Sequence, residues 1–280
     1  MINIGQFNTL ILKNDESFPL YLDGGEQGDI LLTDKKKPEI ATAGDPLTVF
    51  IYTGSEGELL ATTKKPLVEV NQVAWLKVIA LSSAGAFVDW GLPKDLLVPF
   101  SEQDYELEEN RSYLVRVYLD QNNRLAASSY LKQHIHDEAS YLKEGQQVDL
   151  IISHKTDLGY KAIVNHNFWG VLYFNEIFQT LREGQKLRGY IKKIRDDKKI
   201  DLSLNKSGHT HVSPLCEQIL NRLQERDGTL NLSDKSSPED INAAFGVSKK
   251  VFKHAIGTLY KERKITLTKT SISLNETLKE

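Results

Sequence analysis

VAWLKVIALSSAGAFVDWGL, residues 73–92, contains two apolar strands separated by a turn of small residues. In the second strand Val88 alternates with Phe87 and Asp89, the pattern of a strand with one face in a core and the other in water. The strand LLVPF, a polar stretch and the strands YLVRVYLD and RLAASSYL follow within residues 96–131. Five short strands in about 60 residues indicate a small barrel, because closure removes the exposed sheet edges.

The same order of strands recurs on both sides of this stretch. Residues 148–204 contain VDLIISHKT, GYKAIVNH, GVLYF, KLRGYIKKI and KIDLSL, and residues 1–62 contain FNTLILKN, FPLYLDG, DILLT, PLTVFIYTG and ELLATT. A repeated strand order predicts tandem copies of one module. We therefore expect three tandem five-stranded OB-fold barrels, with domain boundaries at 1–65, 66–134 and 140–206.

The apolar period changes to that of helices in the last segment, 213–280. Leu215, Ile219 and Leu223 recur at helical spacing. SSPEDINAAF and the stretch after Ser248 then read as two capped helices joined by Gly-Val-Ser, and KITLTKTSISL reads as two short strands. This order predicts a winged helix-turn-helix. The expected fold is therefore mainly β with a C-terminal α+β domain.

Two connecting segments lack apolar periodicity. They are LKQHIHDEAS at 131–140 and KSGHTHVSP at 206–214. Because such segments usually run as loops, both are candidate hinges.

The composition predicts a cytoplasmic protein. The chain has 280 residues, of which 40% are hydrophobic and 26% charged, as expected for a soluble chain of several domains. Its apolar runs are far shorter than the roughly 20 residues needed to cross a bilayer. The N-terminus lacks a basic stretch followed by an apolar core. We expect no membrane contact and favour a monomer, although the sequence leaves the oligomeric state open.

The residues needed for common catalytic and metal sites are missing. A single cysteine, Cys216, excludes an internal disulfide and a multi-cysteine metal site, and is expected to be a core residue. The pairs His134/His136 and His209/His211 have no acidic or thiol neighbours at ligand spacing. There is no Gly-rich phosphate loop, His-Glu-x-x-His or Gly-x-Ser-x-Gly motif. We expect no catalytic residue, no metal site and no cofactor.

Charge is distributed unevenly along the chain, whose net charge is −3. Residues 1–134 hold 12 Lys and Arg against 19 Asp and Glu, a balance of −7. Residues 135–212 hold 12 against 10 and residues 213–280 hold 11 against 9, a balance of +2 each. A polyanionic partner is therefore expected toward the C-terminal half.

Cations and aromatic residues coincide in the third repeat. Single-stranded nucleic acid is held by rings on which bases stack and by cations along the phosphate path. The candidate RNA contacts there are Tyr160, Tyr173, Tyr190, Lys192, Lys193 and Arg195. The alternative interpretation is a solvated hairpin over a core of aromatics, and we assign Phe168 to that core.

The C-terminal segment offers a second cationic surface. Phe252, Ile256 and Leu259 mark the buried stripe of its last helix. The outward candidates for nucleic-acid contact are Lys249, Lys250, Lys253 and Lys261. Few Asn, Gln or Arg residues accompany them, which favours backbone contact over base reading. A solvated helix or a protein-docking surface is an equal alternative.

Several motifs resemble a known family. GAFVDWG (85–91), LLVPFSE (96–102) and LDQNNRLAASS (119–129) resemble the S1 RNA-binding domain, an OB-fold repeat. The whole architecture resembles the bacterial conserved virulence factor B and YitL family, with three such repeats and a C-terminal winged helix. The most specific part is SSPEDINAAFGVSKKVFKHAIGTLYKERKI (236–265).

This resemblance implies RNA contacts at matching positions of each barrel. The family uses two aromatics three residues apart, a histidine, and an Asp-Arg hairpin pair. The matching residues are Phe18 and Tyr21 in the first repeat, Phe87, Asp120 and Arg124 in the second, and Tyr173, Arg195 and Lys199 in the third, where Lys161 replaces an aromatic. Ala84, Pro99 and Thr33 depart from the pattern.

Simpler roles exist for several of these residues. Phe18 and Tyr21 can fill the first barrel, since residues three apart share a strand face only across a bend or bulge, which Pro19 permits. Asp120 and Arg124 can form a hairpin ion pair. Phe87 is expected to be an exposed ring, because it shares a face with Asp89.

We interpret the chain as a non-catalytic protein that binds single-stranded RNA through combined OB-fold faces and a basic third barrel or winged helix. Linked weak modules gain affinity through effective concentration. The family resemblance implies post-transcriptional regulation of bacterial gene expression. The alternatives are a winged-helix regulator that binds duplex DNA, and a ribosome- or protein-interaction scaffold.

Overall fold

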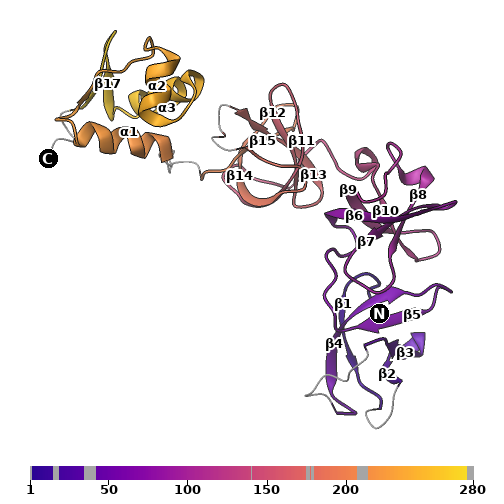
Figure 1. Cartoon of the computed structure of the whole chain (residues 1–280). Coiled ribbons are helices and arrows are strands. Elements are labelled where there is room, and N and C mark those ends of the chain that lie inside the picture. The colour runs from indigo at the N-terminus through magenta and orange to yellow at the C-terminus, as the bar shows by residue number, and fades with distance from the viewer. Residues whose placement is uncertain are drawn as a thin grey trace.

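The structure, a computed structural model, describes residues 2–14, 19–34, 42–139, 141–174, 177, 180–206 and 214–275. Three five-stranded sheets and a C-terminal unit with three helices follow one another in chain order, from indigo to yellow in Figure 1. The predicted fold class, mainly β with a C-terminal α+β domain, is confirmed.

The first barrel alternates apolar and polar residues along short strands. Its strands are β1 (Phe7–Ile11), β2 (Leu20–Asp23), β3 (Asp29–Leu32), β4 (Pro46–Thr53) and β5 (Leu59–Thr62), with a 3₁₀ turn at Gly25–Gln27. The sheet order is β1-β4-β5-β3-β2, and β3 and β5 are parallel. A single bridge between Leu12 and Leu22 joins the two edges. Leu20 and Leu22 point into the core, while Tyr21 faces outward.

The second barrel has the same strands in the same relative positions. They are β6 (Val73–Ser82), β7 (Gly85–Asp89), β8 (Leu96–Pro99), β9 (Ser112–Leu119) and β10 (Leu125–Ser128), with 3₁₀ turns at Phe100–Glu102 and Leu131–Gln133. The sheet order is β10-β9-β6-β7-β8. Val88 is fully buried, as its alternation with Asp89 predicts.

The third barrel is closed by hydrogen bonds. Its strands are β11 (Gln147–Lys155), β12 (Gly159–Val164), β13 (Phe168–Tyr173), β14 (Lys186–Ile194) and β15 (Ile200–Ser203). They form the ring β11-β12-β13-β15-β14, in which β13 and β15 are parallel. The first two sheets have the same cyclic order of strands, but each lacks the ladder between one pair of neighbours: β1 and β2 in the first sheet, and β8 and β10 in the second. The three repeats are therefore versions of one OB-type topology.

The C-terminal unit is a winged helix. It comprises α1 (Pro214–Gln224), β16 (Thr229–Leu230), α2 (Pro238–Phe245), α3 (Lys249–Lys261), β17 (Ile265–Leu267) and β18 (Ile272–Leu274). Ser237 caps α2 by accepting a hydrogen bond from the amide of Asp240, and Ser248 caps α3 in the same way. Gly246 ends α2 with a left-handed backbone, φ 67°. The predicted helices and wing are confirmed, and β16 is an additional strand paired with β18.

The first two barrels share one hydrophobic cluster. Phe50 of β4 lies edge-on to Trp90 in the second barrel, with ring centroids 5.7 Å apart, and both rings are buried. The ammonium of Lys94 donates to the carbonyls of Thr53 (2.8 Å) and Gly54 (2.5 Å). These contacts fix the orientation of the two barrels.

The second and third barrels also pack directly on each other, through a cluster that includes the segment between them. The cluster comprises Val73 and Leu114 of the second barrel, Ile151, Ile163 and Trp169 of the third, and Leu131 and Ile135 of the segment between them. The prediction of a hinge at 131–140 is therefore wrong. The second candidate hinge, 206–214, lies almost wholly outside the described residues.

Backbone pairing reinforces this packing. The amide of His136 donates to the carbonyl of Asn167 (2.9 Å), and the amide of Trp169 donates to the carbonyl of His136 (2.8 Å). The amide of Val73 donates to Nδ1 of His166 (2.9 Å), across the two barrels. The sequence did not predict that Leu131 and Ile135 are buried, because polar and charged residues separate them.

We expect Gly184→Ala to weaken the packing between the second and third barrels. Gly184 has φ +75°, and a Cβ there would lie 2.3 Å from the ring of Trp75. Gly145→Ala is the matched control, because Gly145 has φ +78° with nothing within 4 Å of a Cβ. Urea denaturation should show about 1–3 kcal/mol more destabilisation for Gly184→Ala than for Gly145→Ala. Equal losses would contradict the contact.

Candidate nucleic-acid interface

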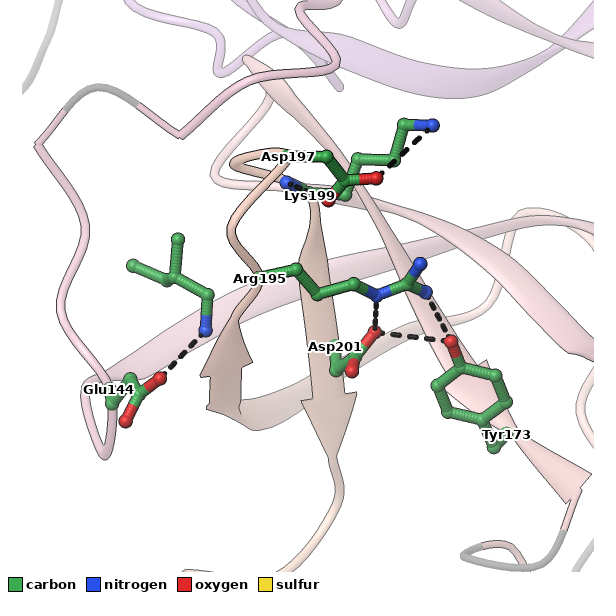
Figure 2. Close-up of polar contacts among 7 residues, drawn as sticks. Glu144, Tyr173, Arg195, Asp197, Lys199 and Asp201 are labelled. Carbon is green, nitrogen blue, oxygen red and sulfur yellow. Dashed lines mark hydrogen bonds and ion pairs between the residues drawn. The ribbon is translucent and has the colours of Figure 1, made fainter.

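A polar network orients Arg195 at the end of β14, as Figure 2 shows. Its Nε donates to the Oδ1 of Asp201 (2.8 Å), and its Nη2 donates to the hydroxyl of Tyr173, which donates to the same Oδ1 (3.2 Å). The hydrogen bond to Asp201 raises the pKa of Arg195 further above its already high ordinary value. The network leaves Nη1 without a hydrogen bond to any described residue.

Two lysines precede this network on an irregular part of β14. The register between β14 and β15 shifts between Ile191 and Lys193, the mark of a β-bulge. Lys192 and Lys193 are both exposed, which strict alternation would not allow for neighbours. The hairpin after them is less available to a ligand, since Lys199 pairs with Asp197 (3.6 Å). We call residues 192–199 the basic hairpin.

The rings predicted beside these cations differ in exposure. Tyr160 belongs to the third core and is 8% exposed. Its ring packs edge-on against that of Phe174, with centroids 5.6 Å apart. Because a base needs an open ring face to stack on, this burial favours packing in the core over the predicted RNA contact. Tyr173 and Tyr190 are half-buried. Phe168 belongs to the core, as predicted.

The candidates in the first two barrels are more dispersed. Phe18 lies outside the described residues. Tyr21 is exposed on β2, and Phe87 is half-buried on β7 rather than fully exposed. Asp120 and Arg124 form the ion pair of the simpler interpretation, with Oδ2 and Nη2 3.0 Å apart. No contact in the described structure joins Phe87 to Arg124.

Asp120 gives the fold a pH dependence. Burial disfavours its charge, but hydrogen bonds from the amides of Arg124 and Asn122 and the Arg124 side chain outweigh burial and lower the pKa of Asp120 below 3.8. The ionised form therefore stabilises the fold above about pH 4, and this contribution disappears as pH falls through the folded pKa. Asp120→Asn should lower Tm at pH 7 and have a smaller effect at pH 3. A pH-independent difference in Tm would contradict this.

The lysines of α3 are only partly available. Lys253 pairs with Asp234 (3.8 Å), and the ammonium of Lys249 lies 3.5 Å from the carbonyl of Lys235. Lys250 and Lys261 are exposed. Phe252, Ile256 and Leu259 form the buried stripe, as expected, and Cys216 is fully buried.

A cleft at the junction of the second and third barrels was missed by sequence reasoning. Among the residues lining it, only Lys161 was a predicted site residue, while Trp75 and Tyr105 were not. A signal was present for Trp75, because it shares the outward face of β6 with Lys77. Tyr105 lies in an irregular segment, for which no periodicity exists to read.

The family models match both ends of the chain. Residues 4–64 match the S1 domain, and residues 217–274 match the CvfB-like winged helix domain. The uncharacterized protein YitL of Bacillus subtilis is 30% identical over 93% of this chain and 90% of its own length. The chain belongs to the YitL and conserved virulence factor B family.

Other members of this family align over nearly the full length. Conserved virulence factor B of Staphylococcus saprophyticus is 25% identical over 97% of this chain and 93% of its own, and that of Staphylococcus aureus is 28% identical over 94% and 90%. A crystal structure of a multidomain protein with nucleic acid binding domains from Streptococcus pneumoniae covers 97% of this chain and 98% of its own, at 24% identity and a TM-score of 0.42.

The domains of this family member are of nucleic-acid-binding types and are not catalytic types. In the described parts of the chain, no helix is long and apolar enough to cross a membrane. The same residues contain no group of three or more His, Cys, Asp or Glu placed to hold a metal ion. The two matched domain types identify the chain as a multidomain nucleic-acid-binding protein.

Proposed function

We propose that the chain binds single-stranded RNA in the bacterial cytoplasm, without catalysis, and regulates gene expression after transcription. The observation that carries this proposal is the exposure of Lys192 and Lys193 beside the oriented guanidinium of Arg195 on a closed OB-type barrel. Cations along a path on such a barrel suit a phosphate backbone, and OB folds commonly bind single strands.

The packing of the barrels supports binding along one strand. Shared clusters join the first barrel to the second and the second to the third. Their faces are therefore held in fixed positions, and a strand that contacts one face meets the next at a small entropic cost. Barrels with incomplete sets of family contacts can then bind together.

Duplex DNA suits the chain less well. On α3, Lys249 and Lys253 are engaged within the winged helix, and few side chains there can read base edges. The apolar or aromatic side chains of Val251 and Tyr260 are also exposed on α3, which is more typical of protein docking than of groove reading.

Fluorescence anisotropy of labelled oligonucleotides about 20 nucleotides long separates these functions. Single-stranded RNA, single-stranded DNA and duplex DNA are titrated with the full chain at two salt concentrations. We expect the tightest binding for single-stranded RNA, weakening as salt rises. A preference for duplex DNA would replace the proposal with a winged-helix regulator. Co-sedimentation with ribosomes but no oligonucleotide binding would replace it with a scaffold.

A further inference from the structure

A cleft of about 560 Å³ lies between the second and third barrels. Trp75 and Tyr105 reach it from the second barrel, and His154, Lys161 and Trp169 reach it from the third. Its volume is within the range of roughly 300–1,000 Å³ found for small-molecule sites. Both barrels are needed to form it, so it is a property of their packing rather than of either repeat alone.

Aromatic rings on the second-barrel side remain open to solvent. Tyr105 is 57% exposed, and its ring packs at a tilt against that of Tyr113, with centroids 5.7 Å apart. Trp75 is 37% exposed and is supported by the turn at Gly184, which leaves no space for a side chain there. Exposed rings held in place by neighbours stack bases at a low entropic cost.

A lysine that forms no ion pair with the described residues lies on the third-barrel side. The Nζ of Lys161 is 4.1 Å from the centroid of the Trp169 ring, and Lys161 forms no ion pair with any described residue. Burial lowers the pKa of Lys161 and outweighs the attraction of Asp137, because the ammonium is poorly solvated there. Lys132 lines the same cleft, and its Nζ forms a long ion pair with the Oδ2 of Asp104, 4.0 Å away. An incoming anion would compensate the charge of Lys161.

The charges of the cleft also suit a sugar. Asp104 and Glu183 line it together with the two lysines. These carboxylates would repel an unbroken run of phosphates, but they can accept hydrogen bonds from hydroxyl and amino groups. A 2′-hydroxyl is the group that distinguishes RNA from DNA. Rings, a poorly solvated cation and nearby acceptors together match one ribonucleotide.

We infer that this cleft holds one nucleotide of a single-stranded RNA, with its base against Tyr105 and Trp75 and its phosphate at Lys161. The inference rests on the proposed function and adds a subsite to it. The subsite is separate from the basic hairpin, because none of the lysines of the hairpin lines the cleft.

The test is anisotropy of a labelled 20-nucleotide oligouridylate RNA with the full chain and matched variants. Tyr105→Ala should weaken binding about ten-fold, whereas Tyr141→Ala, at a tyrosine of similar exposure outside the cleft, should not change it. Lys161→Gln should reduce the salt slope by about 0.7. Lys161→Arg should restore that slope, and Lys65→Gln, an exposed lysine before β6, should leave it unchanged.

Circular dichroism melting identifies any variant that fails to fold. If Lys161→Gln fails to fold, the comparison of Tyr105→Ala with Tyr141→Ala carries the test. Unchanged RNA binding in Tyr105→Ala and Lys161→Gln, with binding lost on substitution of the basic hairpin, would overturn the cleft and leave the proposed function standing. Equal losses in Tyr105→Ala and Tyr141→Ala would also overturn it. Absence of RNA binding by the unmodified chain would overturn both.

Discussion

Replacing Trp90 with alanine is expected to lower the free energy of unfolding by about 3–5 kcal/mol. Trp90 is 2% exposed, packs edge-on against Phe50 of the first barrel, and donates from Nε1 to the carbonyl of Lys94 (2.6 Å). The substitution removes the ring from a cluster that both barrels share and leaves a cavity in it. Hydrogen exchange should therefore accelerate in the first and second barrels together.

Phe252→Ala is a control with a similar local effect in another core. Phe252 is fully buried in the winged helix, in a cluster whose members all come from residue 215 onward. Its loss should accelerate exchange in α1, α2 and α3 and leave the barrels unchanged. If Trp90→Ala accelerates exchange only in the second barrel, the shared cluster does not couple the two barrels.

The double substitution Lys192→Gln, Lys193→Gln is expected to weaken binding of single-stranded RNA about twenty-fold at 0.1 M salt and to reduce the salt slope by about 1.4. Each phosphate contact on a single strand contributes about 0.7 to that slope, and the two lysines are exposed on the bulged part of β14. Arg195 is left unchanged, because its substitution would also break the network with Asp201 and Tyr173.

The matched control is Lys64→Gln, Lys65→Gln, which removes the same charge from two exposed lysines between β5 and β6. Anisotropy titrations over a range of salt concentrations should show no change in slope for this control. A loss of the same size in both double variants would indicate that net charge, rather than the basic hairpin, sets the affinity.

The architecture could be predicted because it depends on local patterns. Alternation placed Val88 in a core, and the serine caps with Gly246 defined the helices of the winged helix. The pair of neighbouring strands that lacks hydrogen bonds in each of the first two barrels could not be predicted. It depends on contacts between strands that are far apart in sequence. The packed segment 131–139 was also missed, because its two buried residues are separated by polar and charged ones.

The candidate site was predicted less well, for reasons visible at single residues. Tyr160 precedes Lys161 on β12, where every residue except Lys161 is buried, so no alternation shows that its ring packs inside the third barrel. The bulge before Lys193 places two neighbouring lysines outside, and a strict strand pattern would divide them between two faces. Trp75 and Tyr105 become neighbours of Lys161 only when the barrels pack, which no local pattern shows.

The most direct test of the central claim is photo-crosslinking of a 4-thiouridine-labelled single-stranded RNA to the full chain, with the crosslinked peptides identified by mass spectrometry. We expect crosslinks in the β14–β15 region of the third barrel and at the junction cleft, removed by excess unlabelled RNA but not by duplex DNA. Crosslinks confined to the winged helix and removed by duplex DNA would contradict the account.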